Sequence, residues 1–408
     1  MNRLPILAVA LLAVVSLGCG KDNASSQSKP PIDGDSRSIA LPPPGKPLVG
    51  TKPPMPAAVI VAHPPYRVDT LASGLEVPWD IAFVSRERMY VTERPGRVRL
   101  VEKGKLRDKP YAVIRSVAAG EGGLMGIALH PRYPNPPWVY VMYTYSSAGE
   151  PHNRISRFTD TGSTLSDEKI LLEGIRGAMY HDGGALRFGP DGQLYAGTGD
   201  AGRPESAQDR SSLSGKILRM TPGGTVPPDN PFPNSFVYAY GLRNVQGLAW
   251  NPANNDLWAT MHGPSGEFGL EAMDSVFIVT KGANCGWPRS LGVTNAHGVT
   301  PPYLFFPGRS VPPAQCTFYT GSLMPELRGS FFFATLASGH LQRVVLSKPG
   351  HATRIERWFE TGMHEGKYGR LRAVVQGPDG ALYVTTSNRD RRGRVNPGDD
   401  RILRIRPK

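Results

Sequence analysis

The stretch GPDGQLYAGTGD at residues 189–200 decides the fold, because it recurs as GPDGALYVTTSN at residues 377–388. In both copies an Asp-Gly pair supplies the positive φ that a tight hairpin turn needs. The residues that follow alternate as they do in a strand that packs one face against its neighbour. Each copy therefore predicts a tight turn followed by a short β-strand.

A turn-rich segment followed by a short aromatic and aliphatic strand occurs six times along the chain. The six copies are FVSRERMYVTERPG from 83, HPRYPNPPWVYVMYT from 130, GPDGQLYAGTGD from 189, NPANNDLWATMHGP from 251, PELRGSFFFATLASG from 325 and GPDGALYVTTSN from 377. Their strands are marked by the aromatic residues Tyr90, Tyr140, Tyr195, Trp258, Phe332 and Tyr383. Successive markers lie 50 to 74 residues apart, which leaves room for four short strands and their turns.

The repeat predicts an all-β fold, a six-bladed β-propeller of four-stranded antiparallel blades over residues 66–408. The longer intervals, around residues 200–240 and 262–325, predict insertions on one face, where propellers usually carry their sites.

Composition agrees with this fold. The chain has 408 residues, 39% of them hydrophobic, with 47 glycines and 40 prolines, and its mean hydropathy is −0.29. Such a chain is globular and rich in turns, and long helical periodicity is hard to find in it.

The formal net charge of +13 is not accompanied by a nucleic-acid recognition motif, and an exported protein rarely meets nucleic acid, so we expect no nucleic-acid partner. Part of the excess is local: nine arginines crowd the last forty residues, where they either line an anionic site or solvate a surface. They are Arg370, Arg372, Arg389, Arg391, Arg392, Arg394, Arg401, Arg404 and Arg406.

The N-terminus has the pattern of an export signal over residues 1–19. Arg3 precedes an apolar run from Leu4 to Leu17, which is shorter than the roughly 20 residues that a spanning helix needs. Gly18-Cys19 resembles a bacterial lipoprotein cleavage site, so we expect an exported, periplasmic or cell-surface protein that is lipid-anchored through Cys19. The alternative is cleavage as an ordinary signal. Residues 20–65 are rich in Lys, Ser, Pro and Gly and predict a disordered tether.

With Cys19 lipidated, Cys285 and Cys316 are the two remaining cysteines. In an oxidising compartment they either pair as a disulfide or stay as two isolated buried thiols.

His181 and Asp200 are additions to the repeat. The second GPDG copy is preceded by LRAVVQ, which has no histidine, whereas HDGG precedes the first copy and GD follows its strand. A histidine beside a turn is often structural, but residues added to a repeat are better functional candidates than the repeat residues themselves.

Further additions occur in a fixed order along the chain. They are EVPWDIAF and VTERPGRVRLV near the start, GEGGLMGIALHP (120–131), DNPFPN (229–234), YAYGLRNVQGLAWNP (238–252), HGP (262–264), KGANCGWP (281–288), FYTGSLMPELRG (318–329) and GRLRAVVQGPDGALYVTT (369–386). Each motif is weak alone, but the ordered set resembles the glucose/sorbosone dehydrogenase family, the soluble aldose sugar dehydrogenases that depend on pyrroloquinoline quinone (PQQ). The resemblance covers roughly residues 66–407.

The resemblance implies roles for single residues. His181 matches the general base that takes a hydroxyl proton while a hydride leaves the anomeric carbon for the quinone, a task that suits the pKa of histidine. Asp200 matches the acidic residue beside this base. Arg243 and Asn244 match a pair that reaches substrate and quinone.

The resemblance also implies the cofactors PQQ and Ca²⁺. Gly263 and Pro264 match residues whose backbone carbonyls bind Ca²⁺, which acts as a Lewis acid. Arg370 and Arg372, spaced i and i+2 on an expected strand, point the same way and can converge on the carboxylates of PQQ. Glu121 lies in the GGL motif, near the expected substrate.

Four positions depart from the family pattern, and so does one short segment. Glu121 stands where the family often has Gln, Met261 where Glu is common before HGP, and Cys285 where Tyr is usual. Ala337 replaces a lysine that contacts the quinone in better-known members, and the acidic pair after HGP is replaced by SGEFGLEAMDS. These changes bear on cofactor affinity and leave the fold untouched.

The sequence thus predicts an exported enzyme that oxidises an aldose-type sugar to its lactone and passes electrons to an external acceptor, a quinone or a cytochrome. It would touch the membrane only through its lipid. Two alternatives stay open. One is a metal-dependent lactonase or hydrolase with ligands such as Asp182, Asp200 and Glu121, and the other is a cofactor-free cell-surface propeller that binds glycan or protein.

Overall fold

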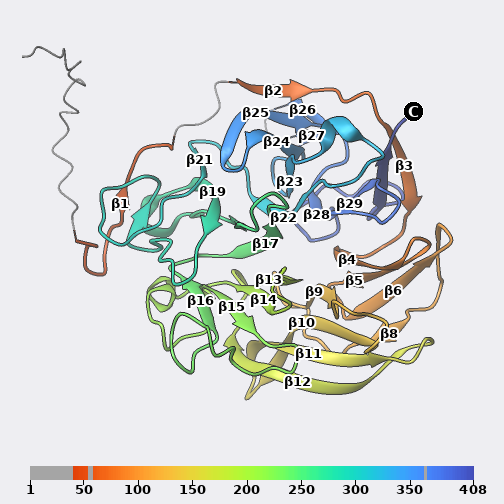
Figure 1. Ribbon diagram of the computed structural model, residues 1–408, viewed down its shortest axis with the longest axis horizontal. Helices are drawn as coiled ribbons and strands as arrows, with labels where there is room; N and C mark the ends of the chain where they lie inside the picture. Colours follow the sequence, from red (N-terminus) through yellow and green to blue (C-terminus); the bar gives the residue numbers. More distant parts are fainter. Residues whose placement is uncertain (1–39, 54–57, 363–364) are drawn as a thin grey trace, which may run out of the picture. The chain divides into compact units, whose positions relative to one another are not determined.

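Six antiparallel sheets stand around a central axis as the blades of a β-propeller (Figure 1). The structure is a computed structural model that describes residues 40–53, 58–362 and 365–408. The innermost strands pack against one another in a closed ring. They are β4 (Pro78–Ser85), β9 (Leu124–Leu129), β13 (Gly183–Phe188), β17 (Val245–Trp250), β22 (Pro313–Phe318) and β28 (Leu371–Gln376).

The remaining blade strands follow outward in chain order, except that β3 forms the outer strand of the last blade. The second strands are β5 (Arg88–Glu93), β10 (Trp138–Ser147), β14 (Leu194–Thr198), β18 (Leu257–Met261), β23 (Phe331–Thr335) and β29 (Leu382–Thr386). The third strands are β6 (Arg97–Glu102), β11 (Glu150–Asp160), β15 (Lys216–Met220), β19 (Ala272–Val279), β24 (Leu341–Lys348) and β30 (Ile402–Arg406). The outer strands are β7 (Lys105–Leu106), β8 (Ala112–Val113), β12 (Leu165–Arg176), β16 (Val237–Tyr240), β21 (Leu304–Pro307), β25 (His351–Trp358) and β3 (Arg67–Ala72).

Each aromatic marker of the repeat lies on the second strand of its own blade. The predicted six-bladed all-β architecture is therefore confirmed. Strand β3, which comes first in the chain among the blade strands, pairs antiparallel with β30 and completes the last blade. This pairing closes the ring by joining the two ends of the propeller.

In each GPDG repeat, the contacts that stabilise the turn lie within the motif itself. Gly192 and Gly380 have φ of 73° and 82°, as a tight hairpin requires. Asp191 accepts a hydrogen bond from the Gln193 N–H at 3.0 Å and another from the Tyr195 hydroxyl at 2.8 Å. Asp379 makes the same two contacts in the other copy. The marker tyrosine of each repeat thus stabilises the turn that precedes it.

Besides the strands given above, the described residues contain five short strands and three 3₁₀ turns. The strands are β1 (Leu48–Val49), β2 (Ala58–Ala62), β20 (Ser290–Leu291), β26 (Glu360–Gly362) and β27 (Glu365–Gly366), and the turns are η1 (Pro204–Ala207), η2 (Glu267–Gly269) and η3 (Pro325–Leu327). No helix in the described part of the chain is long and apolar enough to cross a membrane.

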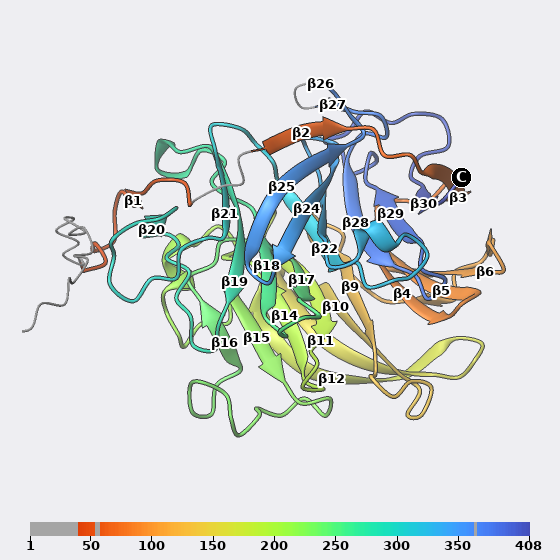
Figure 2. The same ribbon diagram turned by 45° about the horizontal axis from the view of Figure 1, so that its top comes forward.

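The C-terminal part of the predicted tether differs from the expectation. Strand β2 pairs in parallel with β25, as Figure 2 shows, and β1 pairs with β20. The β-branched run AVIVA forms a fifth strand because β25 offers a free edge, so the ordered chain begins before residue 66. The signal at residues 1–19, Cys19 and the tether up to residue 39 lie outside the described residues.

Cys285 and Cys316 are both buried and are not bonded to each other. Of the two alternatives that the sequence left open, the structure has the isolated thiols. Burial raises the pKa of Cys285 to about 12, so this thiol is inert at neutral pH.

Candidate active site

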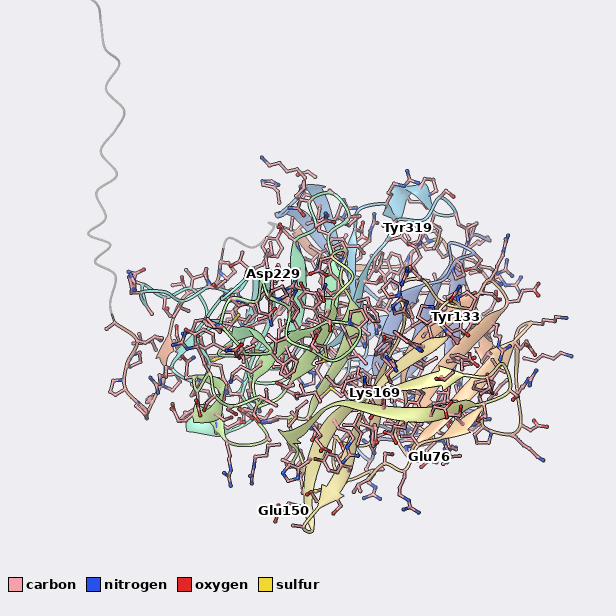
Figure 3. The ribbon with its side chains drawn as sticks, turned by 60° about the horizontal axis from the view of Figure 1, so that its bottom comes forward. Glu76, Tyr133, Glu150, Lys169, Asp229 and Tyr319 are labelled. Atoms are coloured by element: carbon pink, nitrogen blue, oxygen red, sulfur yellow. The ribbon has the colours of Figure 1, made fainter. Side chains whose placement is uncertain are left out.

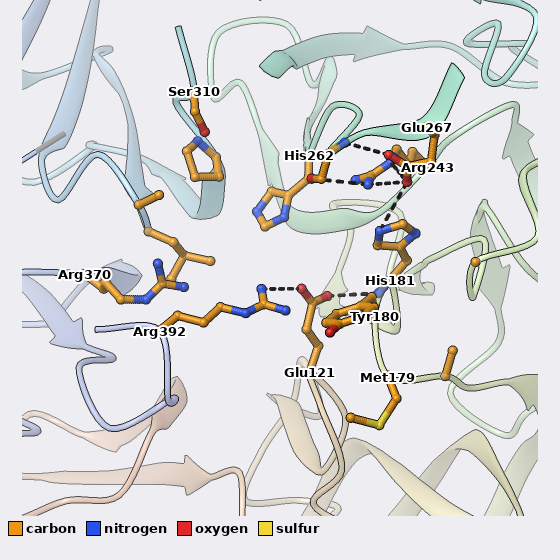
Figure 4. Close-up of a pocket in the computed structure, with 16 residues that line it drawn as sticks. Glu121, Met179, Tyr180, His181, Arg243, His262, Glu267, Ser310, Arg370 and Arg392 are labelled. Carbon is orange, nitrogen blue, oxygen red and sulfur yellow. Dashed lines mark hydrogen bonds and ion pairs between the residues drawn. The ribbon is translucent and has the colours of Figure 1, made fainter. Parts of the chain in front are cut away.

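A cavity of about 690 Å³ opens where the innermost strands begin. Glu121, His181 and Arg243 line it from the positions just before β9, β13 and β17, and Arg370 lines it from the position before β28. Equivalent positions of different blades converge because every inner strand runs in the same direction relative to the axis. Residues far apart in sequence therefore meet at one end of the propeller (Figure 4).

His181 on this wall pairs with the fully buried Asp200. His181 Nδ1 lies 2.7 Å from Asp200 Oδ1, which also accepts the Gly202 N–H at 2.9 Å. Asp200 Oδ2 accepts the indole N–H of Trp287 at 2.8 Å. A Cβ at Gly199 would lie 1.7 Å from the carbonyl oxygen of His181, so only glycine allows this approach. The carboxylate is held in place and orients the imidazole.

The other ring nitrogen of His181 faces Glu267. Nε2 lies 3.7 Å from Glu267 Oε1. The same oxygen accepts hydrogen bonds from Arg243 Nη2 at 2.6 Å and Nε at 3.1 Å, and Oε2 accepts the Ser265 N–H at 2.6 Å. Burial raises the pKa of Glu267, but the charge of Arg243 and the hydrogen bonds from Arg243 and Ser265 together outweigh this effect, so the net shift is downward.

Arg243 is 1% exposed and is tied to the wall by this carboxylate. Its backbone N–H lies 3.2 Å from the sulfur of Met261. Met261, which departs from the family pattern, therefore packs beneath Arg243. Figure 4 shows His181, Arg243 and Glu267 directed toward one another.

Glu121 reaches across the cavity to a different blade. Its Oε2 accepts the His181 N–H at 3.0 Å and Asn244 Nδ2 at 3.1 Å, and its Oε1 accepts Arg392 Nη1 at 2.9 Å. Burial raises the pKa of Glu121, but His262, Arg392 and the hydrogen bond from His181 lower it to about 2. Burial lowers the pKa of His262 itself to about 3, so at neutral pH Arg392 supplies the positive charge.

Asn244 lies behind the wall and does not line the cavity. It is fully buried, and its Oδ1 accepts the Gly183 N–H at 3.0 Å and Gln246 Nε2 at 2.9 Å. Its amide nitrogen bonds Glu121, so both ends of the side chain are engaged within the protein. It positions Glu121 and the start of β13.

Arg370 and Arg372 lie at different depths. Arg370 lines the cavity, and its Nε donates to Asp390 Oδ2 at 2.7 Å. Arg372 is buried below the lining, stacks over Trp79 with its guanidinium carbon 4.9 Å from the ring centroid, and donates to the neutral amide oxygen of Gln246. Its Nε has no partner in the described residues, and burial lowers the pKa of Arg372 to about 10.

Gly263 and Pro264 are buried beside His262 on the cavity wall. The Gly263 N–H donates to Asp274 Oδ1 at 2.9 Å, and Asp274 Oδ2 accepts the Val311 N–H at 2.7 Å. Within residues 40–53, 58–362 and 365–408, no group of three or more His, Cys, Asp or Glu side chains is placed to hold a metal ion.

Sequence reasoning missed three residues of the site. The sequence pattern includes Glu267 only as part of an altered segment, Arg392 only as one arginine of the C-terminal cluster, and His262 only as the start of HGP. His262 Nε2 is buried without a partner among the described residues. A signal exists for His262, which directly follows a repeat strand, but Glu267 and Arg392 lie in insertions without periodicity.

Comparison with known proteins agrees with this fold. Residues 75–396 match the model of the glucose/sorbosone dehydrogenase family. The crystal structure of a Thermus thermophilus protein described as an oxidoreductase (glucose dehydrogenase) is 41% identical, with a TM-score of 0.76, and the alignment covers 83% of this chain and 99% of that one. The PQQ-bound aldose sugar dehydrogenase of Streptomyces coelicolor is 36% identical, with a TM-score of 0.73, over 85% of this chain and 99% of that one.

A curated relative, the aldose sugar dehydrogenase YliI of Escherichia coli, is 29% identical over 356 residues, which are 81% of this chain and 92% of the relative. The family match spans most of the propeller and includes every predicted site residue except Cys19. The chain belongs to the glucose/sorbosone dehydrogenase family.

Proposed function

We propose that this protein oxidises an aldose-type sugar to its lactone by hydride transfer to PQQ, with His181 as the general base. Family membership makes the protein an oxidoreductase of the sugar dehydrogenase class. The observation that carries the specific proposal is the His181–Asp200 pair, because it leaves the Nε2 atom of His181 toward the cavity.

His181 would act through its two nitrogens in different ways. With Nδ1–H donated to Asp200, the lone pair of Nε2 is available to take the proton of a sugar hydroxyl. The imidazolium that results is flanked by Asp200 and Glu267, at 2.7 Å and 3.7 Å. A base positioned in this way typically contributes about 10² to 10⁴ in rate.

The residues around the cavity fit a multiply anionic planar cofactor. Arg372 is a buried guanidinium whose one hydrogen-bond partner in the described residues is a neutral amide. Burying a cation costs desolvation free energy unless an anion pairs with it. Arg370 and Arg372 would hold the carboxylates of PQQ, and Arg243 would contribute at the quinone end. Asn244, which does not line the cavity, would act only by positioning Glu121. When bound, PQQ supplies the acceptor for the hydride.

Calcium is the second group that the family resemblance implies. Gly263 and Pro264 would contribute carbonyl oxygens, and Ca²⁺ accepts such ligands together with ligand and water oxygens. When bound, it supplies a Lewis acid. Because Asp274 and Glu267 are already engaged, we expect calcium affinity to depend on the presence of PQQ.

The proposal has four further parts. The protein is exported, it is lipid-anchored through Cys19, its electron acceptor is an external quinone or cytochrome, and Glu121 lies near the substrate. They rest on the sequence and on the resemblance.

His181→Gln tests the proposal. The activity of the variant in dye-linked sugar oxidation should fall by at least about 10²-fold. Its dissociation constant for PQQ in calorimetric titration should stay within about twofold of wild type, because His181 is not expected to pair with a carboxylate of PQQ. His297→Gln changes an exposed histidine and serves as the control. Equal activity in His181→Gln and wild type would remove His181 from catalysis.

One observation favours a second candidate, a cell-surface propeller without cofactor that binds glycan or protein. The three guanidiniums that line the cavity, those of Arg243, Arg370 and Arg392, already pair with Glu267, Asp390 and Glu121. Titration of the purified protein with PQQ, with and without Ca²⁺, separates the two. Micromolar or tighter binding supports the dehydrogenase, whereas absence of binding supports the second candidate.

A further inference from the structure

A second cavity of about 380 Å³ adjoins the first. Leu336, Ala337, Arg370 and Arg392 line both cavities. The remaining wall of the second cavity comes from Gly339, from Thr361 on β26, from residues 365–369 between β26 and β28, and from the long connection between β29 and β30. The two cavities are therefore adjacent, and Ala337 lies where they meet.

The second cavity is lined by four cationic side chains and one carboxylate. The cations are Lys367, Arg370, Arg392 and Arg394, and the carboxylate is Glu365. Arg370 and Arg392 are paired with Asp390 and Glu121, whereas no ion pair joins Lys367 or Arg394 to a carboxylate of the described residues. The net charge that faces this space is positive.

Neutral groups complete a polar wall. Thr361 and Asn396 add a hydroxyl and an amide, and four glycines, Gly339, Gly366, Gly369 and Gly393, leave the backbone exposed to the space. Hydrogen-bonding groups combined with cations that lack a carboxylate partner suit a polyhydroxylated ligand that carries an oxyanion.

The first cavity does not need the second to hold its own ligands. Its volume lies within the range of about 300–1,000 Å³ that small-molecule sites span. Figure 4 shows Arg370 and Arg392 on the side of the first cavity opposite His181 and Arg243. A substrate that reacts at His181 while PQQ is bound, and that extends past Arg370 beyond the cofactor, would therefore reach the second cavity.

We infer that the second cavity is a subsite for the anionic part of the substrate. The reacting end of an acidic saccharide lies at His181, and its carboxylate or phosphate lies between Lys367 and Arg394. This inference rests on the proposed function and narrows its substrate class from aldoses in general to sugars that carry an oxyanion.

The test compares substrates and variants in the holoenzyme reconstituted with PQQ and Ca²⁺. Digalacturonate supplies carboxylates, glucose 6-phosphate supplies a phosphate, and α-1,4-galactobiose and glucose are their neutral counterparts. Wild type should show a higher kcat/KM for the acidic member of at least one pair. The double variant Lys367→Gln/Arg394→Gln should lower that acidic-to-neutral ratio by about tenfold, and added salt should lower it in wild type.

Arg391→Gln is the matched control, since Arg391 is exposed on the same connection and lines neither cavity. It should leave the ratio unchanged. A wild-type ratio at or below one for both pairs, or equal ratios in wild type and the double variant, would overturn the inference.

Two further readouts separate this inference from the proposed function. If wild type oxidises no sugar, the proposed function fails, and calorimetric binding of digalacturonate to wild type and the double variant still tests the subsite. Weaker binding in the double variant supports the inference. If instead the double variant loses affinity for PQQ by tenfold or more, these cations serve the cofactor, and the inference is overturned.

Discussion

The Nδ1 atom of His181 lies 2.7 Å from the Oδ1 atom of Asp200, at the junction of two neighbouring segments of one blade. The backbone N–H of Gly202 and the indole of Trp287 fix the carboxylate from two other directions. Asp200 therefore cannot follow the imidazole if that ring turns. The ring must instead adopt the orientation that presents Nε2 to the cavity.

Asp200→Asn should lower kcat for sugar oxidation by about 10² to 10⁴-fold, because an amide in place of the carboxylate no longer selects the Nδ1–H tautomer or stabilises the imidazolium. Asn keeps the shape of the side chain, but its amide nitrogen cannot accept the indole N–H of Trp287, so the melting temperature should fall by a few degrees. Steady-state kinetics and circular dichroism melts measure both. Asp209→Asn, an exposed change on the same β14–β15 connection, should match wild type, and a fully active Asp200→Asn would show that His181 works without this partner.

Asp182, next to His181, should make stability fall with rising pH. Burial is the main cause that raises its pKa to about 7, from an ordinary value of 3.8. The native state therefore binds this proton more tightly than the unfolded state does. Its contribution is present below about pH 4 and is lost as the pH rises toward 7, at about 1.4 kcal/mol per pH unit.

Asp182→Asn should remove this loss, since Asn has the shape of the neutral acid and can still accept the hydrogen bonds of Asn153 and Ala178. Between about pH 5 and pH 8 the free energy of unfolding in urea should fall by about 2 kcal/mol less in the variant than in wild type. Asp167→Asn, an exposed change on β12, is the control. Parallel curves for Asp182→Asn and wild type would contradict the prediction.

Lys216 holds the connection that carries Asp200. It is fully buried, and its ammonium donates to the carbonyl oxygens of Ser206, Ala207 and Ser214 at 2.8, 3.1 and 2.6 Å. Lys216→Met leaves these carbonyls without their donor and should lower the free energy of unfolding by about 3 kcal/mol. Lys169→Met on strand β12, labelled in Figure 3, is exposed and should change it by less than about 0.5 kcal/mol. Urea unfolding measures both, and equal midpoints would show that the carbonyls find other partners.

The fold was predictable because its signal is local. The contacts of Asp191 with Gln193 and Tyr195 span at most four residues, so one short motif predicts both the turn and the strand. The strand at residues 58–62 was missed because its neighbours are Pro-rich and its partner β25 lies almost 300 residues away. Its β-branched run was the available signal.

The site was predictable only in part, because only some of its residues lie beside a local sequence signal. His181, Asp200 and Arg243 lie directly beside repeat strands, so their convergence follows from the propeller. The contact of Glu121 with Arg392 joins residues 271 positions apart, through an insertion without periodicity. No local pattern predicts such a pair, and only the folded chain brings it together.

Glu121 places a negative charge on the wall of a cavity that we expect to bind a polyanion. Its pKa is about 2, so the charge is present throughout the working pH range. It also engages Arg392, which lines the same cavity. Both effects should weaken the binding of PQQ.

Glu121→Gln should therefore tighten PQQ binding, by about tenfold or 1.4 kcal/mol. The amide oxygen can still accept from His181 N–H and Asn244, so the wall keeps its shape, while Arg392 is released toward the ligand. Calorimetric titration should give the same gain at about pH 5 and pH 8, since Glu121 is ionised at both. Glu150→Gln, an exposed change on β11, should leave the affinity unchanged. Weaker binding in Glu121→Gln would instead mean that the carboxylate serves the cofactor by holding Arg392 in place, because loss of that anchor would then outweigh the relief of repulsion.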